Sequence, residues 1–384
     1  MIGYSKQWID EADKKAIIGA VESDFLTQGP AVTEFEEAVA TYCGAKFGVA
    51  ANSATSALHL ACVALNLGPG DWLWTSPNTF LASSNCGLYC GANIDFVDIC
   101  AKTYNISAQA LEMKLQRAKQ HNKLPKVLVL VHFAGQPCDL REIHELSKQY
   151  GFYIIEDAAH AIGSRYENIK IGSCFYSDIT VFSFHAIKTM TTAEGGMATT
   201  NDPGLYQKMK LISSHGMTRD NCLMESESHG PWYYQMTALG YNYRLTEMQA
   251  ALGISQLSKL DDFILKRNKI AEFYAKEFQN LPLVLPYQKK NIYPAWHLYV
   301  VCLKHEVKKD RKEVFVALRE AGIGVNVHYI PIHIQPFYQK MGFKCGDFPV
   351  AEEYYRNCIS LPMYYGLTDE QLIQVVGAVR KILS

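Results

Sequence analysis

The chain has 384 residues, of which 48% are hydrophobic and 20% are charged, so it is long enough for one large domain and a smaller one. Its 37 Lys and Arg residues against 38 Asp and Glu residues give a formal net charge of -1, which does not indicate binding to nucleic acid or to an anionic membrane. The N-terminus lacks the apolar core of a signal peptide, and the longest apolar run, residues 57–67, is shorter than the roughly 20 residues that cross a bilayer. We therefore expect a soluble, cytoplasmic protein.

Eleven cysteines are spread along the chain, from Cys43 to Cys358. Disulfide scaffolds are short and secreted, so we expect these thiols to be reduced. Cys86 and Cys90 lie four residues apart on an expected helix, but no second pair and no nearby histidine completes a zinc set. We expect no metal site.

The apolar pattern of residues 33–156 alternates between helical and strand periodicity. The expected strands cover residues 47–51, 72–75, 94–97, 126–132 and 152–156, and the expected helices cover residues 33–42, 57–67, 79–90, 107–121 and 140–150. Strands that alternate with helices at this spacing predict an α/β fold with a mainly parallel sheet covered on both faces.

The second half of the chain completes this domain and adds a smaller αβ domain. It is expected to contain strand 181–184, helix 205–213, an irregular polar segment at 218–230, a long helical run from 246 to about 278, a connection at 281–294, strand 296–302, helix 311–321, strand 325–328 and helix 369–383. The predicted organisation is an N-terminal arm at 1–30, a large domain at 31–280 and a small C-terminal domain at 281–384.

Lys188 follows the apolar strand 181–184 and stands among small and apolar residues, with no acidic residue closer than Glu194. One interpretation is a solvated surface lysine, which is the usual place for this residue. The other is a lysine whose ammonium group loses hydration, so that its pKa falls and the free amine can attack a carbonyl group. Ser183 adds a hydroxyl group at the end of the same strand. The stretch therefore suggests a Schiff-base lysine beside an anion site.

Three further features each have two interpretations. Residues 52–56, Asn-Ser-Ala-Thr-Ser, lie where a strand gives way to a helix, so they either cap the helix or hold a phosphate group on its N–H groups and hydroxyls. Asp157 follows a buried strand and is either a helix cap or a carboxylate at the ligand-binding edge of the sheet. Phe80 is either a core residue or a ring that stacks on a ligand.

Taken together, these features fit one cofactor. Pyridoxal phosphate needs a phosphate site, an aromatic ring, a carboxylate at its pyridine nitrogen and a Schiff-base lysine. The chain offers Thr55, Phe80, Asp157 and Lys188 in that order, each at or near an expected strand end. A lysine-dependent aldolase on a barrel is an alternative, but it would need neither Asp157 nor a phosphate site.

Along essentially its whole length the chain resembles the fold type I, or aspartate-aminotransferase-fold, enzymes, and among them the DegT/StrS-type nucleotide-sugar aminotransferases. Within that family it looks most like the aminotransferases of the pseudaminic acid pathway. The motifs that carry the likeness are Leu26-Thr-Gln-Gly-Pro30, Asn52-Ser-Ala-Thr-Ser-Ala-Leu58, Glu156-Asp-Ala-Ala-His-Ala161, Ser183-Phe-His-Ala-Ile-Lys188, Glu194-Gly-Gly196, His215-Gly216, Gly240-Tyr-Asn-Tyr-Arg-Leu245 and His328-Tyr-Ile-Pro331.

The resemblance implies roles for individual residues. Lys188 would form the Schiff base and move protons, Asp157 would pair with the pyridinium nitrogen, and His160 would contact the phenolic oxygen, a position where many relatives have Gln. Phosphate would be held by Ser183, Thr55 and the backbone of Ala54, and from the neighbouring subunit of a homodimer by Asn242. The sugar-nucleotide pocket would be lined by Tyr4, Leu26, Thr27, His328 and Tyr329, with Ala54, Ser183 and Asn242 also in reach of the substrate.

The reaction implied by this likeness moves an amino group from L-glutamate to C4 of a UDP-linked 2-acetamido-2,6-dideoxy-4-keto-hexose. Other 4-keto-6-deoxy sugars, of the perosamine, bacillosamine or dTDP-linked type, are alternatives. Relatives that dehydrate sugars have a histidine in place of the lysine, so Lys188 favours transamination. A regulator that binds pyridoxal phosphate without turnover is the alternative outside enzymes.

Overall fold

A computed structural model describes residues 1–383, and at its centre lies a seven-stranded sheet. Its strand order is β1-β9-β8-β5-β4-β2-β3. The strands are β1 (Phe47–Ala51), β2 (Trp72–Thr75), β3 (Asn93–Phe96), β4 (Val127–Val131), β5 (Tyr153–Asp157), β8 (Ile179–Ser183) and β9 (Gly196–Thr200). Only β9 runs antiparallel to its neighbours, and the pairs from β8 to β3 are parallel. The predicted mainly parallel α/β sheet is confirmed.

Helices cover both faces of the sheet, because its central strands β4, β5 and β8 are mainly apolar and buried on both sides. Along β4, Val127 and Val129 belong to one hydrophobic core, while Leu128 and Leu130 belong to the other. The first face is covered by α3 (Ala54–Ala64), α4 (Ala82–Tyr89) and α7 (Pro203–Ser213), and the second by α2 (Pro30–Cys43), α5 (Ala108–Gln120), α6 (Leu140–Tyr150) and α8 (Glu247–Leu257).

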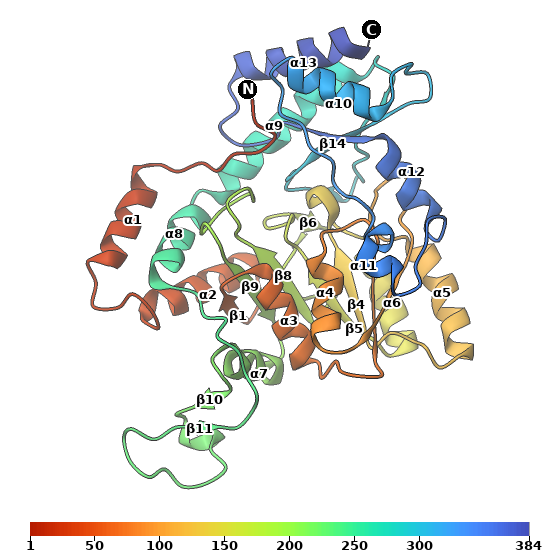
Figure 1. Cartoon of the computed structure of the whole chain (residues 1–384). Coiled ribbons are helices and arrows are strands. Elements are labelled where there is room, and N and C mark those ends of the chain that lie inside the picture. The colour runs from red at the N-terminus through yellow and green to blue at the C-terminus, as the bar shows by residue number, and fades with distance from the viewer. Residues whose placement is uncertain (384) are drawn as a thin grey trace.

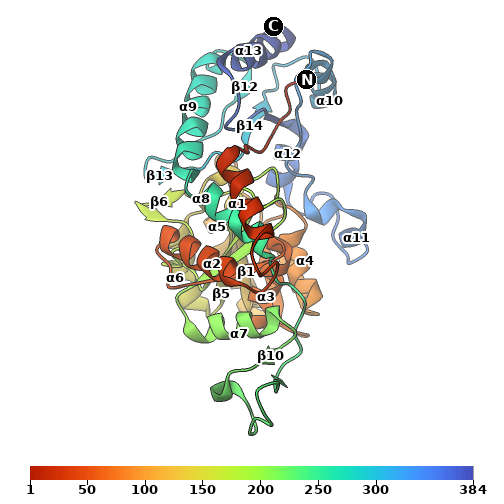
Figure 2. The ribbon, with the colours of Figure 1, turned by 90° about the vertical axis from the view of Figure 1, so that its left-hand side faces the viewer.

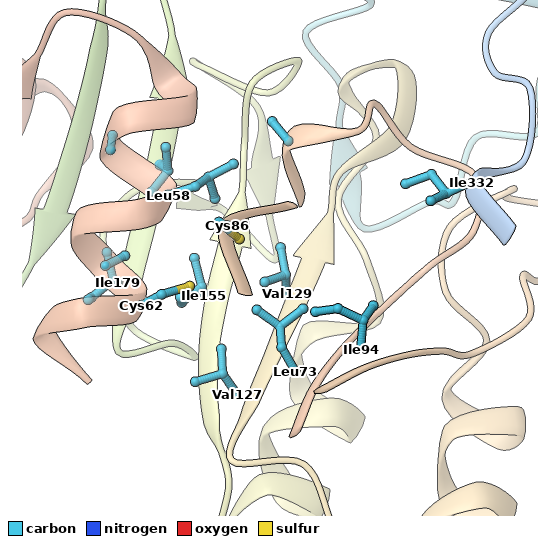
Figure 3. Packing of buried hydrophobic residues seen from close by; sticks show 14 of the residues in the cluster. Leu58, Cys62, Leu73, Cys86, Ile94, Val127, Val129, Ile155, Ile179 and Ile332 are labelled. Atoms are coloured by element: carbon cyan, nitrogen blue, oxygen red, sulfur yellow. The ribbon is translucent and has the colours of Figure 1, made fainter. Parts of the chain in front are cut away.

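Figure 3 shows the packing of the first core at close range, where side chains of α3 and α4 meet those of the strands. Leu58 and Cys62 come from α3 and Cys86 from α4, and all three are buried against the sheet. The first turn of α3 is thereby fixed above the end of β1, which is the position that the site requires.

The helical run predicted from residue 246 to about 278 is wrong in one respect, because it is two helices. α8 ends at Leu257 and α9 (Leu260–Phe278) begins after Ser258 and Lys259. The side chain of Lys259 is drawn to Asp10 and Asp13, with Nζ–Oδ1 distances of 2.9 and 2.7 Å. The break lets α8 pack on the large sheet while α9 leads away from it to the C-terminal elements (Figure 1).

The smaller part of the molecule is built on an antiparallel sheet with the order β12-β14-β15. Its elements are β12 (Leu283–Val284), β14 (Tyr299–Leu303), β15 (Cys358–Leu361), α10 (Arg311–Glu320) and α13 (Asp369–Leu383). Its core also contains Tyr274 and Phe278 of α9, so α9 contributes to this part before the predicted boundary at residue 280. The division at residues 30 and 280 stays a prediction.

The strand predicted at residues 325–328 is wrong. Only one bridge forms there, between Asn326 and Ser360, and the chain then turns away from the sheet. His328 is held instead by its side chain, since its Nδ1 lies 2.7 Å from Ser360 Oγ, and Tyr354 donates to its carbonyl oxygen at 2.6 Å. These contacts direct the following residue, Tyr329, toward the large sheet.

No helix within residues 1–383 is long and apolar enough to span a bilayer. Several short elements complete the chain. A second small sheet has the order β13-β6-β7, and two-residue strands pair within the mostly irregular segment after α7. These elements are β6 (Arg165–Tyr166), β7 (Ile169–Lys170), β10 (Met217–Thr218), β11 (Gln235–Met236), β13 (Ile292–Tyr293), α11 (Pro336–Gln339) and α12 (Pro349–Asn357).

The N-terminal arm contains a helix that the sequence analysis did not predict, α1 (Glu11–Val21). Asp13 is fully buried and closes a capping box with Asp10. Its carboxylate also accepts hydrogen bonds from Ser255 at 2.7 Å and from Gln256 at 2.8 Å, which ties α1 to α8 (Figure 2). The arm is thereby fixed between the two parts of the molecule.

We predict that Asp13→Ala lowers the free energy of unfolding by about 3 kcal/mol, because the change removes the buried carboxylate that Lys259, Ser255 and Gln256 share. Glu11→Ala, in the same turn but exposed, should change it by less than about 0.5 kcal/mol. Denaturant titration of both variants checks this. Equal losses of unfolding free energy in the two variants would show that the buried contacts of Asp13 do not hold the arm.

Candidate active site

A cavity of about 600 Å³ opens at the carboxyl ends of the parallel strands. Val131, Asp157 and Ser183, the last residues of β4, β5 and β8, form its floor. This edge is where open α/β sheets bind ligands. The walls come from the start of α3, from the N-terminal arm and from residues 326–329, and the predicted site residues among the lining are Tyr4, Ala54, Thr55, Phe80, Asp157, His160, Ser183, Lys188, His328 and Tyr329.

Lys188 lies in this cavity and not on the outer surface, so the surface interpretation of this lysine is wrong. Its backbone N–H bonds to His185 O at 2.9 Å in the turn that follows β8. Burial lowers the pKa of Lys188 from 10.5 to about 8, and the nearby carboxylate of Asp157 opposes that shift. About a tenth of this amine is therefore uncharged at pH 7, far more than for an ordinary lysine, and this form can act as a nucleophile.

Asp157 is buried, and each of its carboxylate oxygens accepts one hydrogen bond. Ser83 Oγ donates to Oδ2 at 2.6 Å, and the N–H of Ala159 donates to Oδ1 at 3.1 Å. No helix begins at this residue, so the helix-cap interpretation is wrong, although the bond to Ala159 closes a local turn. The two bonds fix the carboxylate at the floor of the cavity with acceptor capacity left over.

The start of α3 presents unpaired N–H groups to the cavity, and the capping interpretation holds for one of its residues. Ser53 is the N-cap, and its Oγ accepts from the N–H of Ser56 at 3.1 Å. That leaves Ala54 and Thr55, which line the cavity, with N–H groups at the positive end of the helix. A Cβ on Gly196 would lie 2.5 Å from Ala54 N, so glycine is needed where β9 passes the helix start.

Phe80 is 58% exposed, which excludes the core interpretation of this residue. Its ring lies 6.4 Å from that of Tyr329, and both rings line the cavity. An exposed aromatic ring at the mouth of a cavity is suited to contact with a planar ligand.

Three buried histidines lie near Lys188 without adding charge, and two of them, His160 and His328, line the cavity. Burial lowers the pKa of His160 well below 6.5, and the nearby Lys188 lowers it further. Burial also lowers the pKa of His297, and it lowers the pKa of His328 to about 4. These imidazoles are therefore neutral at physiological pH, and His160 and His328 add hydrogen-bonding groups to the cavity without adding positive charge.

Leu26, Thr27 and Asn242 do not lie in the cavity of their own chain. The carbonyl oxygen of Leu26 accepts from the N–H of Glu247 at 3.0 Å, and Thr27 bridges to Thr246 at the start of α8. Asn242 pairs with Ser214 near the end of α7. The structure of one chain thus brings together ten of the predicted residues and leaves these three outside.

Two groups that hold the cavity residues in place were not found in the sequence. Ser83, in the first turn of α4, donates to Asp157 and also contacts Thr79 just before that helix, but a serine in a helix carries no signal of such contacts. The N–H of Ala134, which bonds to His160, is a backbone group and is invisible in side-chain patterns. Cys86 and Cys90 are free thiols, and within residues 1–383 no group of three His, Cys, Asp or Glu side chains is arranged to hold a metal ion.

The residues present fit pyridoxal phosphate. A carboxylate fixed at the floor suits a protonated pyridine nitrogen, and a lysine with a lowered pKa suits a Schiff base. Unpaired N–H groups at a helix start, with the Ser183 hydroxyl beside them in the cavity lining, suit a phosphate group. The cavity is also larger than this cofactor alone requires, which leaves room for a substrate.

Comparison with known proteins gives a family match over residues 7–380, to the DegT/DnrJ/EryC1/StrS aminotransferase family. The spore coat polysaccharide biosynthesis protein SpsC of Bacillus subtilis is 41% identical over 387 residues, covering 99% of this chain and 97% of SpsC. The UDP-4-amino-4,6-dideoxy-N-acetyl-beta-L-altrosamine transaminase of Campylobacter jejuni is 39% identical over 367 residues, covering 95% and 93%. The GDP-perosamine synthase of Caulobacter vibrioides is 32% identical over 378 residues, covering 98% and 96%.

Solved structures agree with this match. PseC of Helicobacter pylori, an aminotransferase involved in the biosynthesis of pseudoaminic acid, superposes with a TM-score of 0.90 at 34% identity, covering 100% of this chain and 99% of PseC. Spr1654 of Streptococcus pneumoniae in its PMP form also gives a TM-score of 0.90, at 29% identity and with 100% and 99% coverage. The chain belongs to the DegT/DnrJ/EryC1/StrS aminotransferase family and is a pyridoxal-phosphate-dependent sugar aminotransferase with the fold of type I enzymes.

Proposed function

We propose that this enzyme transfers the amino group of L-glutamate to C4 of a UDP-linked 2-acetamido-2,6-dideoxy-4-keto-hexose in pseudaminic acid biosynthesis. The observation that carries the proposal is the 39% identity, over nearly the whole chain, to a relative named for the corresponding altrosamine product. The superposition on PseC supports the same assignment. The perosamine reaction is the second candidate, and the GDP-perosamine synthase match at 32% identity favours it less.

The proposed chemistry assigns a task to each residue at the cavity floor. When bound, pyridoxal phosphate supplies an electron sink for the carbon that loses a proton next to nitrogen. Asp157, with both oxygens anchored, would hold the positive charge at the pyridine nitrogen. Lys188 would carry the cofactor and, once released, move the proton between carbon atoms as a general base. Ala54, Thr55 and Ser183 would hold the phosphate group.

The sugar would lie against the wall of the cavity that is formed by the N-terminal arm and residues 326–329. Tyr4 and His328 are close there, with ring centroids 5.6 Å apart, and they come from opposite ends of the chain. Discrimination between epimers needs only a few kcal/mol, which a small number of hydrogen bonds supplies. Tyr4, His328 and Tyr329 are therefore the residues that we propose set sugar specificity, with Leu26 and Thr27 supplied by another chain.

A homodimer with shared sites would explain why some predicted residues lie outside the cavity of their own chain. The segment that contains β10 and β11 extends away from the rest of the molecule (Figures 1 and 2). It exposes large apolar side chains, with Trp232 at 73% and Leu239 at 74%. Such side chains favour burial against a partner. We propose that this segment packs on a second copy of the chain. Asn242 would then reach the cofactor phosphate bound in the cavity of that copy.

The lowered pKa of Lys188 gives a test on the cofactor-free protein. Only the uncharged amine reacts with an acylating reagent, so labelling of Lys188 should rise with pH and level off above a midpoint near 8. In Asp157→Asn the midpoint should move lower, because the carboxylate charge stabilises the ammonium form. Peptide mass spectrometry over a pH series measures both. A midpoint near 10.5 would mean that the lysine is not desolvated.

The sugar assignment predicts a preference between two epimers. With L-glutamate as donor, kcat/KM for the UDP-linked keto sugar of L-arabino configuration should exceed that for its D-xylo epimer by about 10- to 200-fold. GDP- and dTDP-linked ketones serve as controls for the nucleotide. Preference for the D-xylo epimer, or for a GDP- or dTDP-linked ketone, would overturn the pathway while leaving the aminotransferase chemistry intact.

Shared sites predict complementation between inactive chains. Lys188→Ala and Asn242→Ala homodimers should each be severely impaired. After subunit exchange, each heterodimer has one site with both lesions and one with neither, so part of the activity should return. Exchange of each variant with itself is the control. Failure to regain activity after proven exchange, or a fully active monomer, would refute the shared site.

A further inference from the structure

A tight turn after β4 aims a backbone N–H group at the ring of His160. In this turn Ala134 has a φ of 59° and Gly135 a φ of 93°. Asn105 holds the turn, since its Oδ1 accepts from the N–H of Phe133 at 2.8 Å. The turn also packs on the chain of His160 itself, because a Cβ on Gly135 would lie 2.8 Å from the His160 carbonyl oxygen. The N–H of Ala134 then donates to His160 Nδ1 at 3.3 Å.

This contact fixes the tautomer of His160. A backbone N–H can only donate, so Nδ1 must offer its lone pair, and in a neutral ring the proton is then on Nε2. The ring is neutral because it is buried beside Lys188 and His328. His160 Nε2 lies 3.1 Å from Tyr329 Oη. His160 is therefore the donor in this second bond and Tyr329 is the acceptor.

The hydroxyl hydrogen of Tyr329 is left without a protein acceptor. Within residues 1–383 its Oη makes no hydrogen bond other than the one from His160. The backbone of Tyr329 is fixed, because its N–H donates to Asn78 Oδ1 at 3.3 Å, and its ring is nearly parallel to that of His160. Burial raises the pKa of Tyr329 above its usual value of 10, and the charge of Asp157 adds to this, so the hydrogen is retained.

We propose that Tyr329 donates this hydrogen to an electron-rich oxygen of the molecule bound in the cavity, and that His160 is the positioning residue that orients it. The inference rests on the proposed function, which supplies two such oxygens, the ketone of the sugar and the phenolic oxygen of the cofactor. A hydrogen bond to an oxygen that gains negative charge is stronger than one to a neutral oxygen. The role differs from the sequence-based expectation, in which His160 itself contacts the phenolic oxygen.

The first test needs no activity. In cofactor-free protein labelled with ¹⁵N-histidine, the signal of His160 should show a protonated Nε2 and an unprotonated Nδ1 across neutral pH. The signal is assigned by its loss in His160→Gln. A proton on Nδ1, or on both nitrogens, would overturn the inference whether or not the enzyme aminates sugars.

The second test uses the loaded enzyme and separates the two oxygens. If the acceptor is the sugar ketone, Tyr329→Phe should lower kcat/KM for the keto-sugar half-reaction by about 100-fold and leave the glutamate half-reaction within about twofold. If it is the phenolic oxygen, the pH midpoint of the cofactor absorption should shift instead. An unchanged midpoint together with unchanged half-reactions would contradict the donor role.

The positioning role of His160 is tested by coupling. His160→Leu should reproduce most of the loss seen in Tyr329→Phe, and adding Tyr329→Phe to it should cost little more. His160→Gln should keep most of the activity, because its amide can both accept from Ala134 and donate to Tyr329. Losses that simply multiply in the double variant would show that the two residues act independently. If no sugar is aminated while the histidine signal is as expected, only the proposed function fails.

Discussion

The desolvation of one amine beside one carboxylate is the interaction on which the site depends. Lys188 loses hydration in the cavity and Asp157 only partly compensates, so the amine is poised near neutral pH. The sheet makes this possible, because β5 and β8 are adjacent parallel strands whose carboxyl ends deliver both residues to the same edge. Burial of the central strands β4, β5 and β8 on both faces in turn keeps that edge rigid.

The remaining parts of the fold bring distant segments to that edge. α1 and its buried Asp13 fix the N-terminal arm, which carries Tyr4 into the cavity. The break between α8 and α9 allows the C-terminal part to fold back, so that residues 326–329 close the opposite wall. The neutral histidines then add hydrogen-bonding groups without competing with the lysine for charge. The cavity is thus a product of the whole chain, although its reactive groups come from the end of β5 and the turn after β8.

The strands, and the gathering of Asp157 and Lys188 at one edge of the sheet, were predictable, because apolar runs and the motifs that follow them are local in sequence. What failed depends on contacts between distant residues. The helical pattern is interrupted at Ser258 and Lys259, where Lys259 pairs with Asp10 and Asp13, some 250 residues earlier. Residues 325–328 look like a strand, but side-chain bonds to Ser360 and Tyr354 take over from sheet pairing. The tautomer of His160 depends on one backbone N–H, which no side-chain pattern records.

The central claim is that Lys188 carries the cofactor in this cavity. The most direct measurement is to load the purified protein with pyridoxal phosphate, reduce it with borohydride, digest it and locate the cofactor by peptide mass spectrometry, with Lys188→Ala as the control. We expect the cofactor on Lys188 of the wild-type chain and on no lysine of the control protein. Attachment at another lysine in the wild-type chain would contradict it.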